Sequence, residues 1–270
     1  MSRKIYISAD IEGTCGIAHW DETEKGRVGY DAFARQMSLE VAAACEGAQA
    51  GGAQEILVKD AHDSGRNILP ELLPEGVEIF RAWGRDPFSM MSEIDESYAG
   101  VIFTGYHSAA GWDGNPLSHT MNTQNISVKI NGVAASEMLI NAYTAAMFGV
   151  PVCMATGDTM VCSFIRTLNP NIHTVPVSRG VGNGSVSIHP ATAVRRIRET
   201  AQLAVAEGLK EPERFAIRLP SEFEVEVSYR QHFMARRASF YKGTEQIDPR
   251  TVRYTCEDYM DVLRYLMFTL

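Results

Sequence analysis

Two acidic side chains stand close together near the start of this sequence, where an apolar stretch gives way to a glycine. Residues 4–13 predict a short buried strand that ends with Asp10 and Glu12. Because side chains alternate along a strand, residues two apart point to the same side. Two neighbouring carboxylates repel each other unless a cation or a proton lies between them, and their hard oxygens suit a divalent metal ion. The alternative is a strand that ends in a polar loop, with Asp10 capping the next helix.

The same arrangement follows two later apolar segments. Residues 55–59 lead into Asp60 and His62, again two positions apart, and residues 100–105 lead into His107. In open parallel sheets, ligands bind outside the carboxyl ends of the strands. Three strands are thus expected to deliver metal-type side chains to one edge of the sheet. A mixture of histidine and carboxylate favours zinc, with manganese or cobalt as alternatives, over calcium or magnesium alone.

Further candidates come from the segments that follow these strands. His119 lies in a loop at 111–122, where it is either a solvated histidine or a catalytic acid, base or oxyanion donor. Glu137 opens a helix predicted for 136–148 and is either a complement to the helix dipole or a further metal ligand. Asp158 follows another apolar segment, and we expect it to cap the next helix rather than line the site.

Hydrophobic periodicity predicts the elements that must position these side chains. A helix at 31–49 joins the first two strands into a β-α-β unit. Further strands are expected at 77–81, 125–131, 150–156, 172–177, 215–219, 223–229 and 251–255. Further helices are expected at 87–95, 189–207 and 256–270. The pattern predicts an α/β protein with a three-layer, largely parallel sheet and helices on both faces. We expect a metal-binding catalytic domain at 1–185 and a smaller C-terminal α/β domain at 186–270 that contributes to the pocket or to oligomer contacts.

Composition narrows the class of partner. The chain has 270 residues, 45% of them hydrophobic, and a net charge of -8. This charge argues against nucleic acid or an anionic membrane, because both bind clustered lysine and arginine. No run approaches the roughly 18 apolar residues that span a bilayer. The apolar run at the N-terminus is too short for a signal peptide, so we expect a cytoplasmic protein.

The five cysteines form no C-x-x-C pair, which is typical of reduced and mostly buried thiols. Cys15 lies three residues after Glu12, and we interpret it as a small side chain of the loop, with a nucleophile as the alternative. The glycine-rich segment 180–185 resembles a phosphate loop only superficially, because no Lys-Ser or Lys-Thr pair follows. We expect this segment to be a flexible loop.

The combined pattern resembles the zinc-dependent D-aminopeptidases associated with bacterial dipeptide-transport operons. The motifs that carry the resemblance are SADIEG at 8–13, VKDAH at 58–62, TGYH at 104–107, SHTM at 118–121 and EMLINAY at 137–143. They occur in the order and at the approximate spacing of that family. The resemblance covers most of the chain and weakens after about residue 176. Cys15 and the 180–185 segment depart from the family pattern, which leaves pocket polarity and substrate preference open.

The resemblance implies two zinc ions per subunit, held by Asp10, Glu12, His62, His107 and Glu137. Asp10 would bridge the two ions. Glu12 and His107 would complete one site, and His62 and Glu137 the other. Paired cations of this kind lower the pKa of a bridging water and polarise a scissile carbonyl.

The resemblance also places His119 beside the metals as the catalytic histidine and implies a ring-shaped homo-oligomer, a decamer. The first functional hypothesis is a two-metal aminopeptidase that removes an N-terminal residue, a D-amino acid, from short peptides. A second is a binuclear metallophosphoesterase, which the lack of an arginine or lysine beside the ligand motifs disfavours. A third is a non-catalytic peptide-binding protein with a structural metal, which the histidine beside an open ligand set disfavours.

Overall fold

The computed structural model describes residues 3–270, and its larger sheet has seven strands in the order β3-β2-β1-β4-β7-β8-β9. Neighbours from β3 to β8 run parallel, and β9 is antiparallel to β8. The strands are β1 (Lys4–Ala9), β2 (Glu55–Asp60), β3 (Val77–Phe80), β4 (Gly100–Tyr106), β7 (Val152–Asp158), β8 (His173–Val181) and β9 (Gly184–Ser187). The central strands β4 and β7 are buried along their whole length, as expected where helices cover both faces of a parallel sheet.

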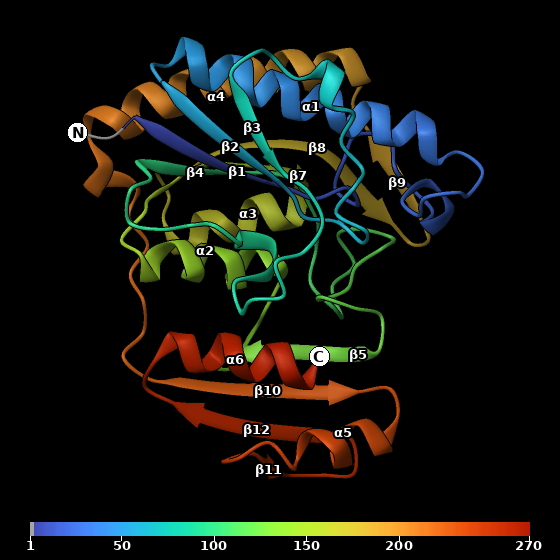
Figure 1. Ribbon diagram of the computed structural model, residues 1–270. Coiled ribbons are helices and arrows are strands. Elements are labelled where there is room, and N and C mark those ends of the chain that lie inside the picture. The colour runs from blue at the N-terminus through green and yellow to red at the C-terminus, as the bar shows by residue number, and fades with distance from the viewer. Residues whose placement is uncertain (1–2) are drawn as a thin grey trace.

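Helices cover both faces of this sheet, which confirms the predicted three-layer α/β architecture (Figure 1). On one face, α1 (Tyr30–Ala50) packs along α4 (Pro190–Lys210). On the other face lie α2 (Glu137–Met147) and α3 (Thr159–Leu168). The two faces bury separate apolar clusters, one against α1 and α4 and the other against α2 and α3.

A second, antiparallel sheet lies below α2 in Figure 1, in the order β11-β12-β10-β5-β6. Its strands are β5 (Asn125–Ile130), β6 (Val133–Ala134), β10 (Phe223–Tyr229), β11 (Glu245–Gln246) and β12 (Thr251–Cys256). The helix α6 (Tyr259–Thr269) packs between this sheet and α2, and α5 (His232–Ala238) covers its far part. The alternation of buried and half-buried residues along β10 is the pattern of a strand with one face on the core.

The two sheets draw strands from both sides of residue 185. The strands β5 and β6 precede that position but belong to the second sheet, whereas β9 spans it and α4 follows it, and both belong to the layers of the first. A division into 1–185 and 186–270 therefore stays a prediction.

Four local expectations are wrong. Segment 87–95 contains only a 3-10 turn at Ser89–Met91, because Ser89 itself adopts a φ of 51°. Segment 180–185 is not a flexible loop but the tip of the β8–β9 hairpin, tied down where the Gly180 N–H donates to the Gly114 carbonyl. Segment 215–219 forms no strand and follows the 3-10 turn Pro212–Phe215. The helix expected to end at residue 207 continues as α4 to Lys210, with Gly208 inside it against the Cys153 thiol.

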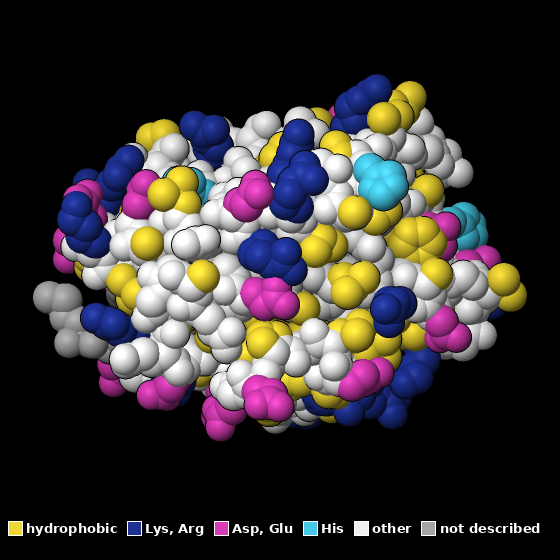
Figure 2. All heavy atoms as spheres, turned by 90° about the horizontal axis from the view of Figure 1, so that it is seen from above, with side chains coloured by type: hydrophobic (Ala, Val, Ile, Leu, Met, Phe, Trp, Pro, Cys, Tyr) yellow, Lys and Arg dark blue, Asp and Glu magenta, His cyan; other side chains and the backbone are white. Residues whose placement is uncertain are grey.

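The surface seen from above the α1 and α4 layer carries basic and acidic side chains interspersed with single hydrophobic ones (Figure 2). No large area of one charge sign gathers on this face. Among residues 3–270, no helix is both long and apolar enough to cross a membrane.

The contact between α1 and α4 predicts the effect of Gly47→Ala. Alanine favours a helix over glycine by about 1 kcal/mol, but a Cβ at position 47 would overlap the Arg198 carbonyl and lie 2.8 Å from the Ala201 Cβ. Overpacking of this kind costs about 1–3 kcal/mol, so we expect a lower free energy of unfolding in urea. The exposed control Arg196→Ala should change it by less than about 0.5 kcal/mol. A more stable Gly47→Ala variant would show that the helices separate freely.

Candidate metal centre

The strand ends that carry the site are locked together by two glycines. After β1, the Gly13 N–H donates to the Gly105 carbonyl over 2.8 Å, and the Asp10 N–H donates to the Thr104 carbonyl. A Cβ on Gly13 would overlap the Tyr106 carbonyl, and one on Gly105, where φ is 68°, would overlap the Asp10 carbonyl. Only glycine permits this close approach, and it brings the end of β1 against the end of β4.

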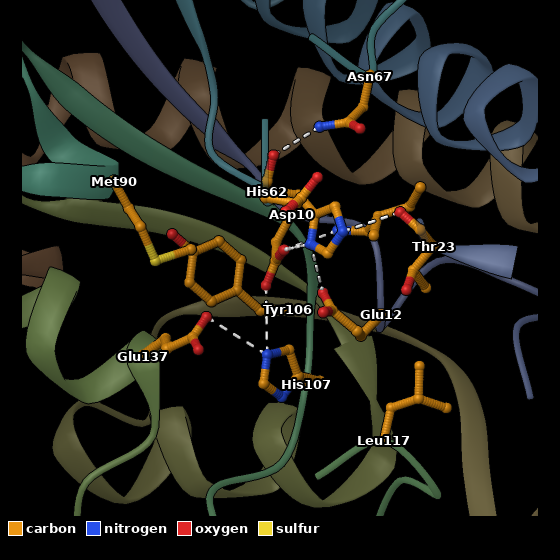
Figure 3. A network of polar contacts seen from close by, with 12 residues as sticks. Asp10, Glu12, Thr23, His62, Asn67, Met90, Tyr106, His107, Leu117 and Glu137 are labelled. Carbon is orange, nitrogen blue, oxygen red and sulfur yellow. Dashed lines mark hydrogen bonds and ion pairs between the residues drawn. The ribbon is translucent and has the colours of Figure 1, made fainter. Parts of the chain in front are cut away.

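Asp10 lies at the centre of the cluster, between two histidines (Figure 3). Its Oδ1 is 3.3 Å from His62 Nδ1, and its Oδ2 is 3.4 Å from His107 Nε2. Glu12 Oε2 lies 3.1 Å from the same His62 nitrogen, and Glu137 Oε2 lies 3.3 Å from the same His107 nitrogen. The four residues around Asp10 come from three strand ends and from the first residue of α2.

The outer nitrogen of each histidine contacts a backbone carbonyl. His62 Nε2 lies 3.0 Å from the Thr23 carbonyl, His107 Nδ1 lies 2.9 Å from the Ser108 carbonyl, and His119 Nδ1 lies 2.9 Å from the Leu117 carbonyl. A carbonyl oxygen only accepts, so each of these nitrogens must carry the hydrogen. The other nitrogen of a neutral ring then presents a lone pair to the carboxylates. Metal-binding histidines have this arrangement, in which the second N–H fixes the tautomer.

His119 stacks on His107 with ring centroids 4.3 Å apart and an angle of 6° between the planes. Its Nε2 lies 3.5 Å from Glu137 Oε1 and 3.8 Å from Glu12 Oε1. The edge of Trp20 contacts its ring, with centroids 5.2 Å apart. His119 is thus held beside the cluster in a fixed orientation, rather than solvated.

The pKa shifts show that this cluster attracts positive charge. Burial, reinforced by the Glu12 carboxylate, raises the pKa of Asp10 well above its usual value. Burial also acts to raise the pKa of Glu12, but the nearby His62 outweighs it and holds that pKa well below its usual value. Burial opposes charge on His62 and His107 as well, yet Glu12 and Glu137 respectively raise the pKa of these two rings.

These residues fit a metal ion, because several of their buried polar atoms have no hydrogen-bond partner. Asp10 Oδ2, Glu12 Oε2 and His107 Nε2 are buried without a hydrogen-bond partner within the described chain. Ligand atoms of Asp10, Glu12 and His62 lie within 4.8 Å of one another, and so do those of Asp10, His107 and Glu137. A cation placed in each group would satisfy these atoms and remove the repulsion between carboxylates.

All five predicted ligands and His119 are therefore brought together, and their roles as ligands stay predictions. The expected pairing of His62 with Glu137 on one metal also stays a prediction; the carboxylates nearest to His62 in the structure are those of Asp10 and Glu12. Glu137 instead lies with His107. Glu12 does approach His107, but in a third group that also contains His119.

Asp60 and Asp158 support the site without belonging to it. Asp60 accepts from the Asn67 N–H, the Asn67 amide and the Ile68 N–H, which fixes the loop that carries His62. Asp158 caps α3, as predicted, and also accepts from the Ser108 N–H and hydroxyl beside His107. Asp60 therefore does not share the metal-facing side of His62.

Cys15 is a buried side chain of the loop after β1. Burial and the nearby Glu40 carboxyl raise the pKa of its thiol to about 12, and its Sγ donates to the Ile188 carbonyl. It is therefore no activated nucleophile, which agrees with its interpretation as a packing residue.

A cavity of about 710 Å³ opens over the cluster, within the range of small-molecule sites. Several of the residues that line this cavity were not predicted from the sequence. Trp20 and Trp83 come from loops without periodicity, and Leu263 and Leu266 from α6 of the second sheet layer. Arg85 also lines it, and its only sequence signal is a single basic residue in a polar loop.

Carboxylates and histidines at the carboxyl ends of parallel strands, beneath an open cavity, define a metal-dependent hydrolase of the α/β class. Comparison with known proteins agrees. The profile of the D-aminopeptidase family matches residues 3–268, so this chain belongs to that family and is a peptidase.

Two relatives match over nearly the whole chain. A D-aminopeptidase from Bacillus subtilis (strain 168) is 27% identical over 266 residues, which cover 98% of this chain and 95% of that protein. The solved structure of the Zn-dependent D-aminopeptidase DppA from Bacillus subtilis, described as a self-compartmentalizing protease, matches with a TM-score of 0.89 at 25% identity. That match covers 98% of this chain and 96% of the other. The predicted family and fold class are confirmed.

Glu40 in α1 predicts a pH dependence of stability. Its Oε1 accepts from the Cys15 N–H, and burial raises its pKa to about 7. An ordinary unfolded glutamate loses its proton near pH 4.3, so between about pH 4.3 and 7 unfolding releases a proton and stability falls as pH rises. The neutral variant Glu40→Gln should gain on the order of 3 kcal/mol relative to wild type between pH 4.5 and 8.

Urea unfolding at several pH values measures this difference. The exposed control Glu199→Gln in α4 should run parallel to wild type across the range. A constant difference between Glu40→Gln and wild type from pH 4.5 to 8 would mean that Glu40 is ionised throughout.

Proposed function

We propose that this protein is a two-zinc aminopeptidase that removes the N-terminal residue, a D-amino acid, from short peptides. The observation that carries the proposal is the division of ligands around Asp10, whose two oxygens each face one histidine and one further carboxylate. Histidine with carboxylate is a donor set that zinc accepts. The solved relative named as Zn-dependent supports the choice of metal, and the names of both relatives support the D-configuration.

Two bound zinc ions would supply a water of lowered pKa and a polarised scissile carbonyl. The residues of the chain orient that chemistry. Asp10 would hold both ions, and Glu12, His62, His107 and Glu137 would complete the two sites. The N–H bonds to the Thr23 and Ser108 carbonyls keep both ligand rings in the metal-facing tautomer.

His119 would act on the reacting peptide through Nε2. Its Nδ1–H is committed to the Leu117 carbonyl, so Nε2 is the atom that can take up or deliver a proton. With that nitrogen protonated, the ring can donate to the developing oxyanion or to the leaving amine. Trp20 and His107 on its faces restrict rotation of the ring.

The family membership disfavours a phosphoesterase, and the open cavity over the cluster disfavours a purely structural metal.

We also propose a ring-shaped homodecamer in the cytoplasm. Support for assembly comes from the relative described as self-compartmentalizing and from exposed aromatic side chains on the second sheet layer, namely Phe233, Phe240 and Phe268.

The zinc content of variants tests whether Asp10 is a ligand of both metal ions. Asp10→Ala should bind fewer than half of the zinc equivalents of wild type, because both groups lose a ligand. Glu12→Ala and His62→Ala should each weaken only one of the two sites and retain about one equivalent. Elemental analysis after dialysis measures the content, with thermal unfolding as the control for folding. Equal zinc in wild type and folded Asp10→Ala would disprove the bridging role.

Activity tests the role of His119. His119→Ala should retain zinc and lose about 100-fold or more in kcat on D-alanyl peptides, the usual size for an acid, base or oxyanion donor. His173→Ala is the matched control, because His173 pairs with Glu207 away from the site. The wild-type enzyme is assayed on D-alanyl and L-alanyl peptides and on p-nitrophenyl phosphate. Phosphatase activity alone, or no peptidase activity at full zinc occupancy, would overturn the proposed function.

A further inference from the structure

Apart from its histidines, the cavity over the cluster is lined by acidic side chains and one basic side chain. Its lining contains six carboxylates, those of Asp10, Glu12, Glu24, Asp63, Asp86 and Glu137. Arg85 is the one lysine or arginine among the lining residues. An anionic group of a ligand would be repelled from most of this wall. Away from the metal centre, Arg85 is therefore the place in the cavity that attracts such a group.

Arg85 is not used by the fold. Its side chain is exposed, and within residues 3–270 its guanidinium has no ion pair or side-chain hydrogen bond. The five N–H donors of a guanidinium form a planar fork that matches a carboxylate. An arginine with a structural task would have its donors occupied by protein acceptors, and Arg85 does not.

The loop that carries Arg85 is fastened to the loop that carries His62. The Trp83 indole N–H donates to the Asp63 carbonyl over 2.7 Å, and the Ala82 N–H donates to the Gly65 carbonyl over 2.7 Å. The buried Lys59 at the end of β2 donates to the Ala82 carbonyl and lies over the Trp83 ring. Arg85, two residues after Trp83, is therefore held on the same side of the cavity as the metal centre.

The backbone of this wall is unusual. Seven non-glycine residues of the described chain have positive φ, and four of them line the cavity: Asp63, Arg85, Ser89 and Met121. Arg85 has a φ of 61°. Side chains held in this region persist where the surroundings impose them, and such residues cluster at ligand sites. The strain at Arg85 has no packing benefit, because the side chain is exposed.

We propose that Arg85 binds the C-terminal carboxylate of the substrate and so selects very short peptides. The inference rests on the proposed function, in which the N-terminal residue of the peptide lies at the Asp10 cluster. A carboxylate at the far end of a dipeptide or tripeptide then reaches the cavity wall, since each extended residue spans roughly 3.3–3.6 Å. A longer or C-terminally blocked peptide offers no charge to Arg85.

Steady-state kinetics on paired substrates test this role. D-Ala-D-Ala has a free carboxylate, and D-Ala-D-Ala-amide has none but is otherwise the same. Arg85→Gln should raise KM for the free acid by about 10- to 100-fold, the size of a lost hydrogen bond to a charged group, with kcat little changed. KM for the amide should stay within about twofold of wild type, and Arg85→Lys should recover part of the loss for the free acid.

Arg81→Gln is the matched control, because Arg81 is exposed shortly before Arg85 and does not line the cavity. It should leave both substrates unchanged. Equal effects of Arg85→Gln on acid and amide, no effect on either, or the same effect from Arg81→Gln would overturn the role of Arg85. Wild-type enzyme at full zinc occupancy that cleaves neither substrate would instead overturn the proposed function.

Discussion

The structure depends on a group of buried carboxylates and histidines that the fold brings together without balancing their charges. Three carboxylates are buried within contact of two histidine rings, and the outer N–H of each ring is committed to a backbone carbonyl. The remaining nitrogen of a neutral ring then faces carboxylate oxygens with a lone pair. Protons or metal ions must occupy the space between them, and the fixed tautomers favour a metal. The site is therefore organised for cations before any cation binds.

The fold around the cluster holds these charged side chains close together. Gly13 and Gly105 bring the ends of β1 and β4 closer than any side chain would allow. Asp60 and Asp158 direct their carboxylates to backbone N–H groups of neighbouring loops rather than to the cluster. A buried carboxylate with several N–H donors is satisfied, whereas Asp10 and Glu12 retain bare oxygens. The same residue type thus serves as support or as ligand according to the donors around it.

Four candidate ligands, Asp10, Glu12, His62 and His107, were readable from the sequence because each follows an apolar strand, and parallel strand ends meet at one edge. Glu137 was readable as the start of a predicted helix. The orientation of their side chains was not readable. The nitrogen of His62 that faces inward is set by the Thr23 carbonyl, 39 residues away along the chain. Local periodicity failed where tertiary contacts decide the conformation, as at Ser89 with its positive φ and at Gly208 inside α4. The strand β5 was predicted as an element, but nothing in its residues assigns it to the second sheet.

The cavity itself combines two kinds of wall with different physical characters. The ligand wall is made of strand ends and the start of α2, whose backbone is tied into the sheet and helix. The other walls come from α6, through Leu263 and Leu266, and from loops with positive-φ residues at Arg85 and Met121. Rigid elements suit the ligands, because metal geometry tolerates little displacement. Loops suit substrate selection, because their side chains change without disturbing the sheet. Under the proposed function, the catalytic chemistry would reside on strand ends and the start of α2, and substrate choice on loops that are fastened to them, as Trp83 is to Asp63.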